Sequence, residues 1–399
     1  MNIFKAAYCR TFQFVMKVAI PLLPYRQSKI LQSANEAAEV IKQLNVKKVF
    51  IATDAGVVKC GLTEDFKKAL TENEIEYVVY DKTMPNPTID SVEEARTMYI
   101  ENGCQTIAAI GGGSAMDLAK ACGARIVRPK KSVKQMGGLL HVGKKLPPLF
   151  AFPTTAGTGS ETTIAAVITD SKTHRKFAIN DFPLIPKYAV LDYKLTLGLP
   201  KAMTAYTGMD ALTHAVEAYI GRSTTRDTRA KAVEAVKLII DNLKVCYDDP
   251  TNAEARKNML FASHYAGIAF TKSYVGYVHA VAHSLSGRYG LGHGLTNAVL
   301  LPVVLEVYGK KVYKKLARLA RASSVAELTD NNEVAAKKFI ARIYEMNEYM
   351  NIPKGFEEIK DEDIPLMAKY ADMEGNPLYP VPKLMNKKQL SKIYYMVKL

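Results

Sequence analysis

Short hydrophobic runs alternate with helical patterns from about residue 46 to residue 195. The runs are rich in β-branched and aromatic residues and predict strands at KKVFIAT, EYVVYD and TIAAI. Between them, apolar residues recur at three- and four-residue spacing, which predicts helices at TEDFKKALTEN and SVEEARTMYIEN. This alternation is typical of βαβ units, so we expect a parallel sheet in this half. Further strands are predicted at LFAFPTT, TTIAAVITD and YAVLD, some of them forming a hairpin.

Beyond Pro200 the pattern changes to helical periodicity alone. Apolar residues recur three and four positions apart in DALTHAVEAYI, AKAVEAVKLIIDNL and KKLARLARAS. At 399 residues the chain is long enough for two domains of ordinary size. We therefore predict an α/β domain with a parallel sheet over residues 1–198 and an all-helical domain over residues 199–399, with a cleft between the two lobes.

Composition and cysteine usage narrow the class of protein. Hydrophobic residues make up 48% and charged residues 23% of the chain, which excludes disordered and fibrous proteins. The five cysteines are scattered and form no C-x-x-C pair, so we expect free thiols in a reducing cytoplasm. The apolar start FQFVMKVAIPLLP is interrupted by Lys17, and no run approaches the roughly 20 residues of a membrane helix, so no membrane partner is expected.

The formal net charge of +15 raises a second class of function. A basic balance is found in proteins that bind nucleic acid or anionic surfaces, and also on ordinary soluble surfaces. The lysines here form scattered pairs, and no zinc-finger or RNA-recognition signature accompanies them. No nucleic-acid partner is therefore expected, and a basic binder of nucleic acid or an anionic surface, built on a retired enzyme scaffold, stays the alternative.

Two loops rich in glycine and small polar residues follow predicted strands. In TIAAIGGGSAMDLAK, Gly111, Gly112 and Gly113 lie between a strand and a helix, where backbone N–H groups can hold a phosphate. The loop PTTAGTGSETT follows the strand LFAF and carries threonine hydroxyls. Open α/β sheets bind ligands at the carboxyl ends of their strands, so the two loops favour one extended ligand such as a dinucleotide. The spacing is not G-x-G-x-x-G, and tight turns without a ligand are the alternative.

Asp54 follows the predicted strand VFIAT. A carboxylate at this position can accept hydrogen bonds from ribose hydroxyls and repel a 2′-phosphate, which favours NAD over NADP. Capping of a helix N-terminus is the alternative role for Asp54.

Aspartate and histidine recur at metal-binding spacings in the helical half. GMDALTHAVEAY places Asp210 and His214 four residues apart on one helix face, and YVHAVAHSLSG does the same for His279 and His283. His293 follows ten residues later, beyond glycines that let the chain turn back. One carboxylate and two or three imidazoles can therefore converge on a metal ion, with surface or capping contacts as the alternative. HAVAH lacks the glutamate of an H-E-x-x-H protease helix.

The motifs GGGSAMDLAK, PTTAGTGSE, TGMDALTHAVEAY, VGYVHAVAHSLSG and HGLTNAVLLP, in this order, resemble the iron-containing (group III) alcohol dehydrogenase family. The resemblance implies that family's dehydroquinate synthase-like fold, with a dinucleotide-binding α/β domain and a helical metal-binding domain. It implies a catalytic role for His283 beside the metal, and it implies the metal ligands Asp210, His214, His279 and His293. Residues implied to line the cofactor cleft are Asp54, Asn86, Gly112, Gly113, Ser114, Thr154, Thr155, Thr158 and Lys176. Ser286 and Gly292 depart from the family pattern, and neither change removes a ligand.

The resemblance also implies an activity, the NAD-linked, metal-dependent interconversion of a small alcohol and its aldehyde or ketone by hydride transfer. A metal held by these ligands acts as a Lewis acid on the alcohol oxygen, and His283 relays the proton or orients the substrate. Iron is expected, with zinc as the alternative because zinc binds nitrogen and oxygen ligands more strongly. A polyol dehydrogenase of the glycerol type is the nearest alternative enzyme, and a homodimer or larger homo-oligomer is implied.

Overall fold

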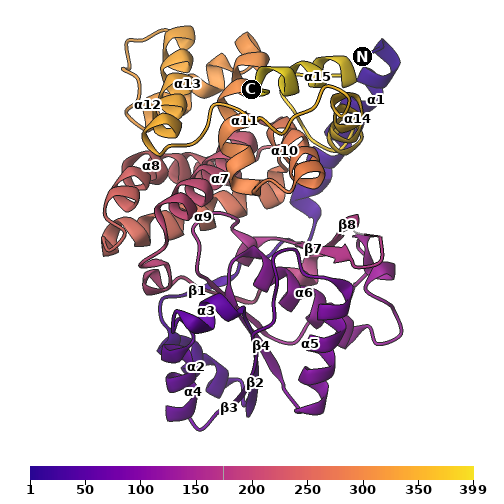
Figure 1. The fold of residues 1–399 in the computed structure, drawn as a ribbon, viewed down its shortest axis with the longest axis vertical. Helices are drawn as coiled ribbons and strands as arrows, with labels where there is room; N and C mark the ends of the chain where they lie inside the picture. Colours follow the sequence, from indigo (N-terminus) through magenta and orange to yellow (C-terminus); the bar gives the residue numbers. More distant parts are fainter. Residues whose placement is uncertain (174) are drawn as a thin grey trace. The chain divides into compact units, whose positions relative to one another are not determined.

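The computed structural model describes residues 1–173 and 175–399, and the chain divides into two compact units. One unit contains Pro24–Leu197 and carries the strands. The other contains Met1–Leu23 and Gly198–Leu399 and is built from helices (Figure 1). The α/β fold and the all-helical fold predicted for the two halves are both confirmed.

The first 23 residues correct the predicted domain boundary, because they belong to the helical unit and not to the α/β domain. Helix α1 (Ile3–Ala19) packs against a segment near the C-terminus. The buried Gln13 side chain donates from Nε2 to Tyr379 O (2.7 Å), and the Arg10 guanidinium donates to Val381 O (2.7 Å). Local periodicity carries no information about this docking, since Gln13 and Tyr379 are 366 residues apart in the chain.

The main sheet of the α/β unit is parallel. In the described part of the chain it has six strands in the order β1-β9-β6-β4-β2-β3. Their bounds are β1 (Lys29–Leu31), β2 (Lys48–Ala52), β3 (Glu76–Tyr80), β4 (Thr106–Gly111), β6 (Leu149–Pro153) and β9 (Tyr188–Val190). Because the strands run in one direction, the carboxyl ends of the neighbours β2, β4 and β6 lie along one edge of the sheet.

Helices cover both faces of this sheet (Figure 1). They are α2 (Ala34–Gln43), α3 (Ala55–Lys59), α4 (Glu64–Glu72), α5 (Ile89–Glu101) and α6 (Gly113–Val127). In β2, Val49 and Ile51 pack in the core under α2 and α4, whereas Phe50 and Ala52 pack in the core under α5 and α6. Consecutive residues of a strand point to opposite faces, so burial on both sides explains why these strands read as unbroken hydrophobic runs.

A second sheet contains the predicted hairpin. Its three strands, in the described residues, have the order β5-β8-β7. Strands β7 (Ala165–Asp170) and β8 (Arg175–Asn180) are antiparallel, and β5 (Gly138–Leu139) pairs in parallel with β8.

The other helices of the helical unit pack around α7 (Lys201–Ile220), whose residues from Gly208 to Ile220 are all buried. A Cβ added to Gly208 would lie 2.3 Å from Leu243 Cδ1, so glycine allows α8 to approach α7 closely. The other helices are α8 (Arg226–Asp248), α9 (Ala253–Ser273), α10 (Tyr277–Tyr289), α11 (His293–Tyr308), α12 (Tyr313–Ala322), α13 (Asn332–Tyr349), α14 (Ile364–Gly375) and α15 (Lys387–Met396). Among the described residues, none of the helices combines the length and apolar character that a membrane crossing requires.

Candidate metal centre and nucleotide-binding loops

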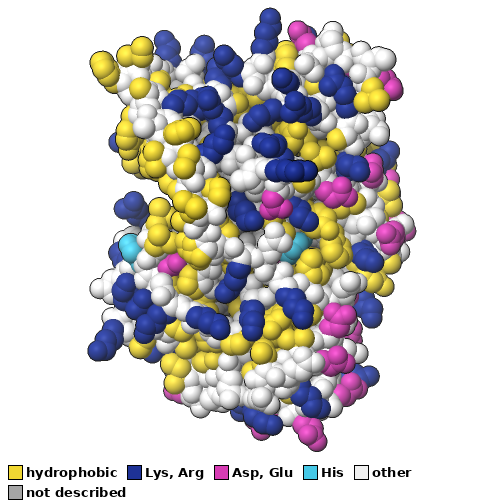
Figure 2. Space-filling view, turned by 180° about the vertical axis from the view of Figure 1, so that it is seen from behind, with side chains coloured by type: hydrophobic (Ala, Val, Ile, Leu, Met, Phe, Trp, Pro, Cys, Tyr) yellow, Lys and Arg dark blue, Asp and Glu magenta, His cyan; other side chains and the backbone are white. Residues whose placement is uncertain are grey.

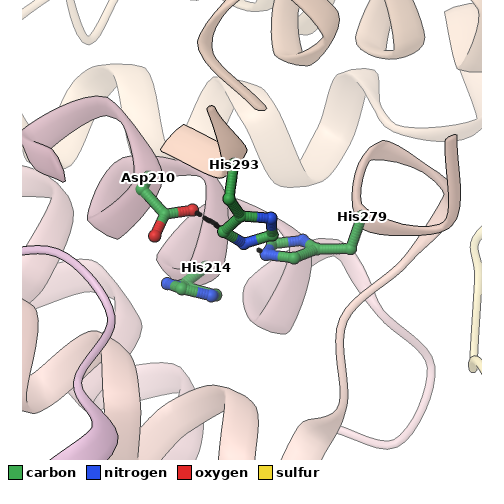
Figure 3. A group of neighbouring side chains, drawn as sticks. All are labelled: Asp210, His214, His279 and His293. Atoms are coloured by element: carbon green, nitrogen blue, oxygen red, sulfur yellow. Dashed lines mark ion pairs between the residues drawn. The ribbon is translucent and has the colours of Figure 1, made fainter. Parts of the chain in front are cut away.

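The four residues that the sequence predicts as metal ligands lie together in the helical unit (Figure 3). Asp210 and His214 project from adjacent turns of α7, His279 comes from α10, and His293 is the first residue of α11. One ligand atom from each residue lies within 4.8 Å of those from the others. Residues from three helices therefore present one carboxylate and three imidazoles to a single point.

Two glycines place His293 in this group. The chain leaves α10 through Gly290, whose φ of 70° is left-handed and ends the helix. A Cβ added to Gly294 would lie 2.5 Å from Tyr206 O, so glycine at this position lets the start of α11 approach α7. The result is a distance of 3.5 Å between His293 Nε2 and Asp210 Oδ1.

The His214 ring is held by flat packing on two sides. It stacks on Phe270 with ring centroids 4.2 Å apart and on His279 with centroids 4.6 Å apart. Stacking restricts rotation of the imidazole, so the ring is already oriented for the ligand role predicted for it.

Glu217, one turn of α7 beyond His214, organises the start of α10. Its carboxylate accepts hydrogen bonds from Gly276 N (2.8 Å), Val278 N (2.8 Å) and His279 Nδ1 (2.7 Å). The first two bonds satisfy N–H groups at the N-terminus of the helix, and the third fixes the His279 tautomer. Burial raises the pKa of this carboxyl to about 7, although the three hydrogen bonds oppose the shift. With Nδ1 donating, the Nε2 lone pair of His279 is available toward the other ligands.

The buried Asn297 amide touches three of the four ligand residues. Its Nδ2 donates to Asp210 Oδ1 (2.6 Å) and lies 3.2 Å from His279 Nε2 and 3.1 Å from His293 Nε2. Burial first, and then the neighbouring imidazoles, holds the pKa of His279 well below its usual value. Three imidazoles and a carboxylate that converge in this way fit a divalent metal such as Fe²⁺ or Zn²⁺.

His283 lies beside this group and is not one of the four converging ligands. Its ring stacks on His293 with centroids 5.2 Å apart, and its Nδ1 lies 2.6 Å from Glu374 Oε1 of α14. Tyr379 also donates to Glu374, with an oxygen separation of 2.7 Å. Burial opposes ionisation of Glu374, but the His283 charge and these two hydrogen bonds outweigh it, and the net pKa is lowered. The His283 side chain is 43% exposed, so its ring has contact with solvent.

The two glycine loops meet at the carboxyl edge of the main sheet. Gly111 pairs with Pro153 at the ends of β4 and β6, and Thr154 N donates to Gly111 O (3.1 Å). Helix α6 begins after Gly112, and no described side chain caps its first N–H groups. Uncapped N–H groups at the start of a helix suit a phosphate. Ser114 lies in the first turn of α6, within the same loop.

The glycines of the first loop give room to the threonines of the second. A Cβ added to Gly112 would lie 3.7 Å from Thr155 Oγ1, and one added to Gly113 would lie 3.2 Å from Thr158 Cγ2. The Gly113 contact is tighter than an ordinary van der Waals contact, so glycine at this position eases the close approach of the two loops, whereas a Cβ at Gly112 would only touch Thr155.

The remaining predicted cofactor residues lie at the same unit's strand ends and hairpin. Asp54 caps α3, with Oδ1 accepting from Val57 N (2.9 Å), which is the alternative role considered for it. Asn86 has a left-handed φ of 59°, and the next residue, Pro87, accepts a hydrogen bond from Thr169 N (2.8 Å). Thr169 also pairs with Lys176 across β7 and β8. Thr169 therefore connects the turn at Asn86 with the strand that carries Lys176.

Lys120 of α6, which is not among the residues predicted from the sequence, is buried and holds the second loop in place. Its side chain is fully buried, and Nζ lies 2.7 Å from Ser160 O, 2.7 Å from Thr163 Oγ1 and 2.9 Å from Ala165 O. Asp117, one turn earlier, accepts from Val167 N (3.1 Å). Burial lowers the pKa of Lys120 to about 8 and raises that of Asp117 to about 6, while each charge partly offsets the other's shift. A lysine inside the apolar GGGSAMDLAK helix was the signal available in the sequence.

Family models match both units of the chain. The family described as iron-containing alcohol dehydrogenase matches residues 28–193, and its Fe-containing alcohol dehydrogenase C-terminal part matches residues 204–397. Alcohol dehydrogenase 4 of Saccharomyces cerevisiae is 38% identical over 340 residues, which cover 84% of this chain and 87% of the yeast protein. The NAD-dependent methanol dehydrogenase of Bacillus methanolicus is 35% identical over 347 residues, 85% of this chain and 89% of the other.

Solved structures agree with the family matches. A crystal structure of 1,3-propanediol oxidoreductase has a TM-score of 0.90 at 33% identity, covering 94% of this chain and 100% of the other. Sulfoacetaldehyde reductase from Bifidobacterium kashiwanohense, in complex with NAD⁺, has a TM-score of 0.84 at 26% identity, with coverages of 94% and 98%. The chain therefore belongs to the iron-containing alcohol dehydrogenase family, and it is an NAD-dependent oxidoreductase that acts on alcohols.

Proposed function

We propose that this enzyme interconverts a small alcohol and its aldehyde or ketone, with Fe²⁺ held by Asp210, His214, His279 and His293. The convergence of one carboxylate and three imidazoles from three helices carries the proposal. Relatives named for methanol and 1,3-propanediol support a small substrate. Zinc is the alternative occupant, because ligands of this type bind it more strongly.

The protein's own groups prepare this site for chemistry. A divalent metal there supplies Lewis acidity, which stabilises negative charge on the substrate oxygen. Glu217 keeps the proton of His279 on Nδ1, so Nε2 stays available as a ligand atom. Asn297 donates to the Asp210 carboxylate and restricts its orientation. These two residues position the ligands and are not themselves proposed as ligands.

His283 is the residue that we assign to proton movement. Its Nδ1 is engaged with Glu374, so Nε2 is the atom that would take up or release a proton. Its ring packs against His293 and also reaches solvent. This arrangement supports a relay between the metal site and water, or orientation of the substrate by the same ring.

The α/β unit is proposed to bind NAD through the two loops. The N-terminus of α6 would hold the pyrophosphate, with Gly112, Gly113 and Ser114 beside it. The contributing residues of the second loop and the hairpin would be Thr154, Thr155, Thr158, Asn86 and Lys176. Asp54 uses Oδ1 for its helix cap, which leaves its second oxygen to accept from a ribose hydroxyl and disfavours NADP.

Metal analysis combined with a substrate assay tests the proposal. Protein purified without oxygen or chelator should contain near-stoichiometric iron and oxidise NADH with short aldehydes. Activity should disappear on metal removal and return with Fe²⁺, and NADPH should serve poorly. Asp210→Ala should empty the site, whereas Asp241→Ala, at an exposed position of α8, should not. Full activity of metal-free protein would refute the proposed mechanism.

Assembly and compartment are further parts of the proposal. We propose a homodimer or larger homo-oligomer in the cytoplasm. The five cysteines are all free, which supports a reducing compartment. Light scattering during size-exclusion chromatography measures the assembly directly, and a monomeric mass would refute that part.

A further inference from the structure

A hollow in the helical unit is lined mainly by positive charge. Its volume is about 350 Å³, and its lining includes Tyr219 and Thr224. Five of the eight lining residues are basic: Lys17, Arg222, Arg229, Lys315 and Arg318. None of the described lining residues is acidic, and none is a proposed metal ligand. The hollow is therefore a separate feature from the metal centre.

These cations have no acidic partners within the described part of the chain. The carboxylate of Asp227, two residues before Arg229 in the first turn of α8, pairs with Lys272 at 3.2 Å. Figure 2 shows that Lys and Arg side chains are numerous on the surface of this protein, in keeping with its net charge of +15. In the hollow, however, the basic groups are concentrated in a concave site and are not spread over a solvated face.

Helix ends account for only two of the five charges. Lys315 Nζ donates to Ile220 O (2.8 Å) and Gly221 O (2.5 Å) at the C-terminal end of α7, and Lys17 lies in the last turn of α1. The partial negative charge of a helix C-terminus favours cations at such positions. These two lysines thus have a structural use.

Among the described residues, the side chains of the three arginines donate to no helix C-terminus. Arg229 lies near the N-terminus of α8, where the helix dipole disfavours a cation, and its contacts with Thr224 are long, at 3.3 and 3.4 Å. The side chains of Arg222 and Arg318 are exposed at the hollow. Burial, and then repulsion from the other four cations, lowers the pKa of Lys315 to about 8. An anion in the hollow would relieve this repulsion.

We propose that the hollow binds a phosphate-bearing anion, such as a diphosphate group. Guanidinium groups present pairs of N–H donors that match phosphate oxygens, and three of them line one cavity here. The concave shape fits a compact group better than the backbone of a nucleic-acid duplex. The anion could be a free phosphate compound or the headgroup of a phospholipid, and both present the same chemistry.

Titration with inorganic pyrophosphate tests the site. Calorimetry is carried out on the metal-loaded enzyme with saturating NAD, so that the glycine loops of the other unit are occupied. Removing two charge-assisted phosphate contacts in Arg222→Gln/Arg318→Gln should weaken binding at least tenfold. A control that removes two charges outside the hollow, Lys388→Gln/Lys392→Gln, should bind as the wild type does. Thermal unfolding of all three proteins checks that the variants fold.

A second arm distinguishes the source of the phosphate. Vesicles of phosphatidylcholine with phosphatidic acid are sedimented with the same three proteins, and pure phosphatidylcholine is the blank. Binding of pyrophosphate that is lost in the arginine variant supports a free phosphate compound as the ligand. Binding of the acidic vesicles alone, lost in the same variant, supports a lipid headgroup. If neither probe binds, or if the arginine variant and the wild type bind equally, the proposal is wrong.

Discussion

Replacement of Glu217 with glutamine should loosen the metal centre without removing a ligand. The carboxylate receives three buried hydrogen bonds: Oε2 accepts from Gly276 N and His279 Nδ1, and Oε1 accepts from Val278 N. Glutamine offers one acceptor oxygen in place of two. With its oxygen at the Oε2 position, its NH2 group faces the N–H of Val278. With its oxygen at the Oε1 position, its NH2 group faces Gly276 N and His279 Nδ1.

In either orientation the buried NH2 group of the glutamine faces at least one N–H donor, and that donor loses its acceptor. A buried donor left without an acceptor costs about 1–3 kcal/mol, so unfolding of the metal-free variant should need about that much less free energy. In the second orientation His279 must move its proton to Nε2 to accept at Nδ1, and the lone pair that a metal needs is then lost. Changing the hydrogen-bond partner of a metal-binding histidine typically weakens metal affinity by about 10- to 100-fold, and we expect a loss of that size.

Competition with a chelator measures the metal affinity, and urea titration measures the stability. The measurement belongs at pH 8, above the Glu217 pKa of about 7, so that the wild-type carboxyl is ionised. Glu234→Gln is the matched control, because Glu234 lies on α8 of the same unit with its side chain 49% exposed. If Glu217→Gln holds the metal as tightly as the wild type, Glu217 does not position His279 and the reasoning is refuted.

Three further changes test other parts of the structure. His283→Ala should lower turnover by roughly 100-fold, as removal of an acid–base group typically does, with metal content unchanged in elemental analysis; a loss of metal would make His283 a ligand. Lys120→Met leaves buried acceptors of the second loop unpaired, so it should cost about 3 kcal/mol in urea unfolding and weaken NAD binding in calorimetry. An unchanged NAD affinity would refute the loop-holding role of Lys120. For Asp117, burial raises the pKa from 3.8 to about 6, so the folded protein binds more protons than the unfolded chain between these values. Stability should therefore fall as pH rises from 4 to 6, by up to about 1.4 kcal/mol per pH unit, relative to Asp117→Asn. Parallel urea-unfolding profiles of the two proteins would show that Asp117 does not titrate in this way.

Local spacing was enough to predict that one carboxylate and two or three imidazoles can converge, and the family resemblance supplied the choice of four ligands. Asp210 and His214 share a helix face because they are four residues apart, and the same spacing relates His279 to His283. The spacing could not decide which of the two α10 histidines joins the group, because that depends on how α10 packs. The structure brings His279 to the other ligands and directs His283 to Glu374, which is 91 residues further along the chain.

The residues that position the proposed ligands could be predicted from the sequence only in part. Glu217 lies seven residues after Asp210, and Asn297 lies four residues after His293, so both share a helix face with a ligand and a search along those faces would find them. The docking of α1 had no such signal. Its contacts are with backbone carbonyls near residue 380. Every residue has a backbone carbonyl, so the residue types at these positions do not reveal the contact.

The place of α1 in the helical unit sets the order in which the protein can be completed during synthesis. Gln13 leaves the ribosome first among the residues of its contact, and its partner Tyr379 follows 366 residues later. At about 5–20 residues per second, α1 waits roughly 20 to 70 s for the segment on which it docks. Pro24–Leu197 form a unit that is continuous in sequence, so the α/β unit can fold during that interval. The helical unit cannot close until the segment around Tyr379 has been synthesised, so α1 has no docking site before then.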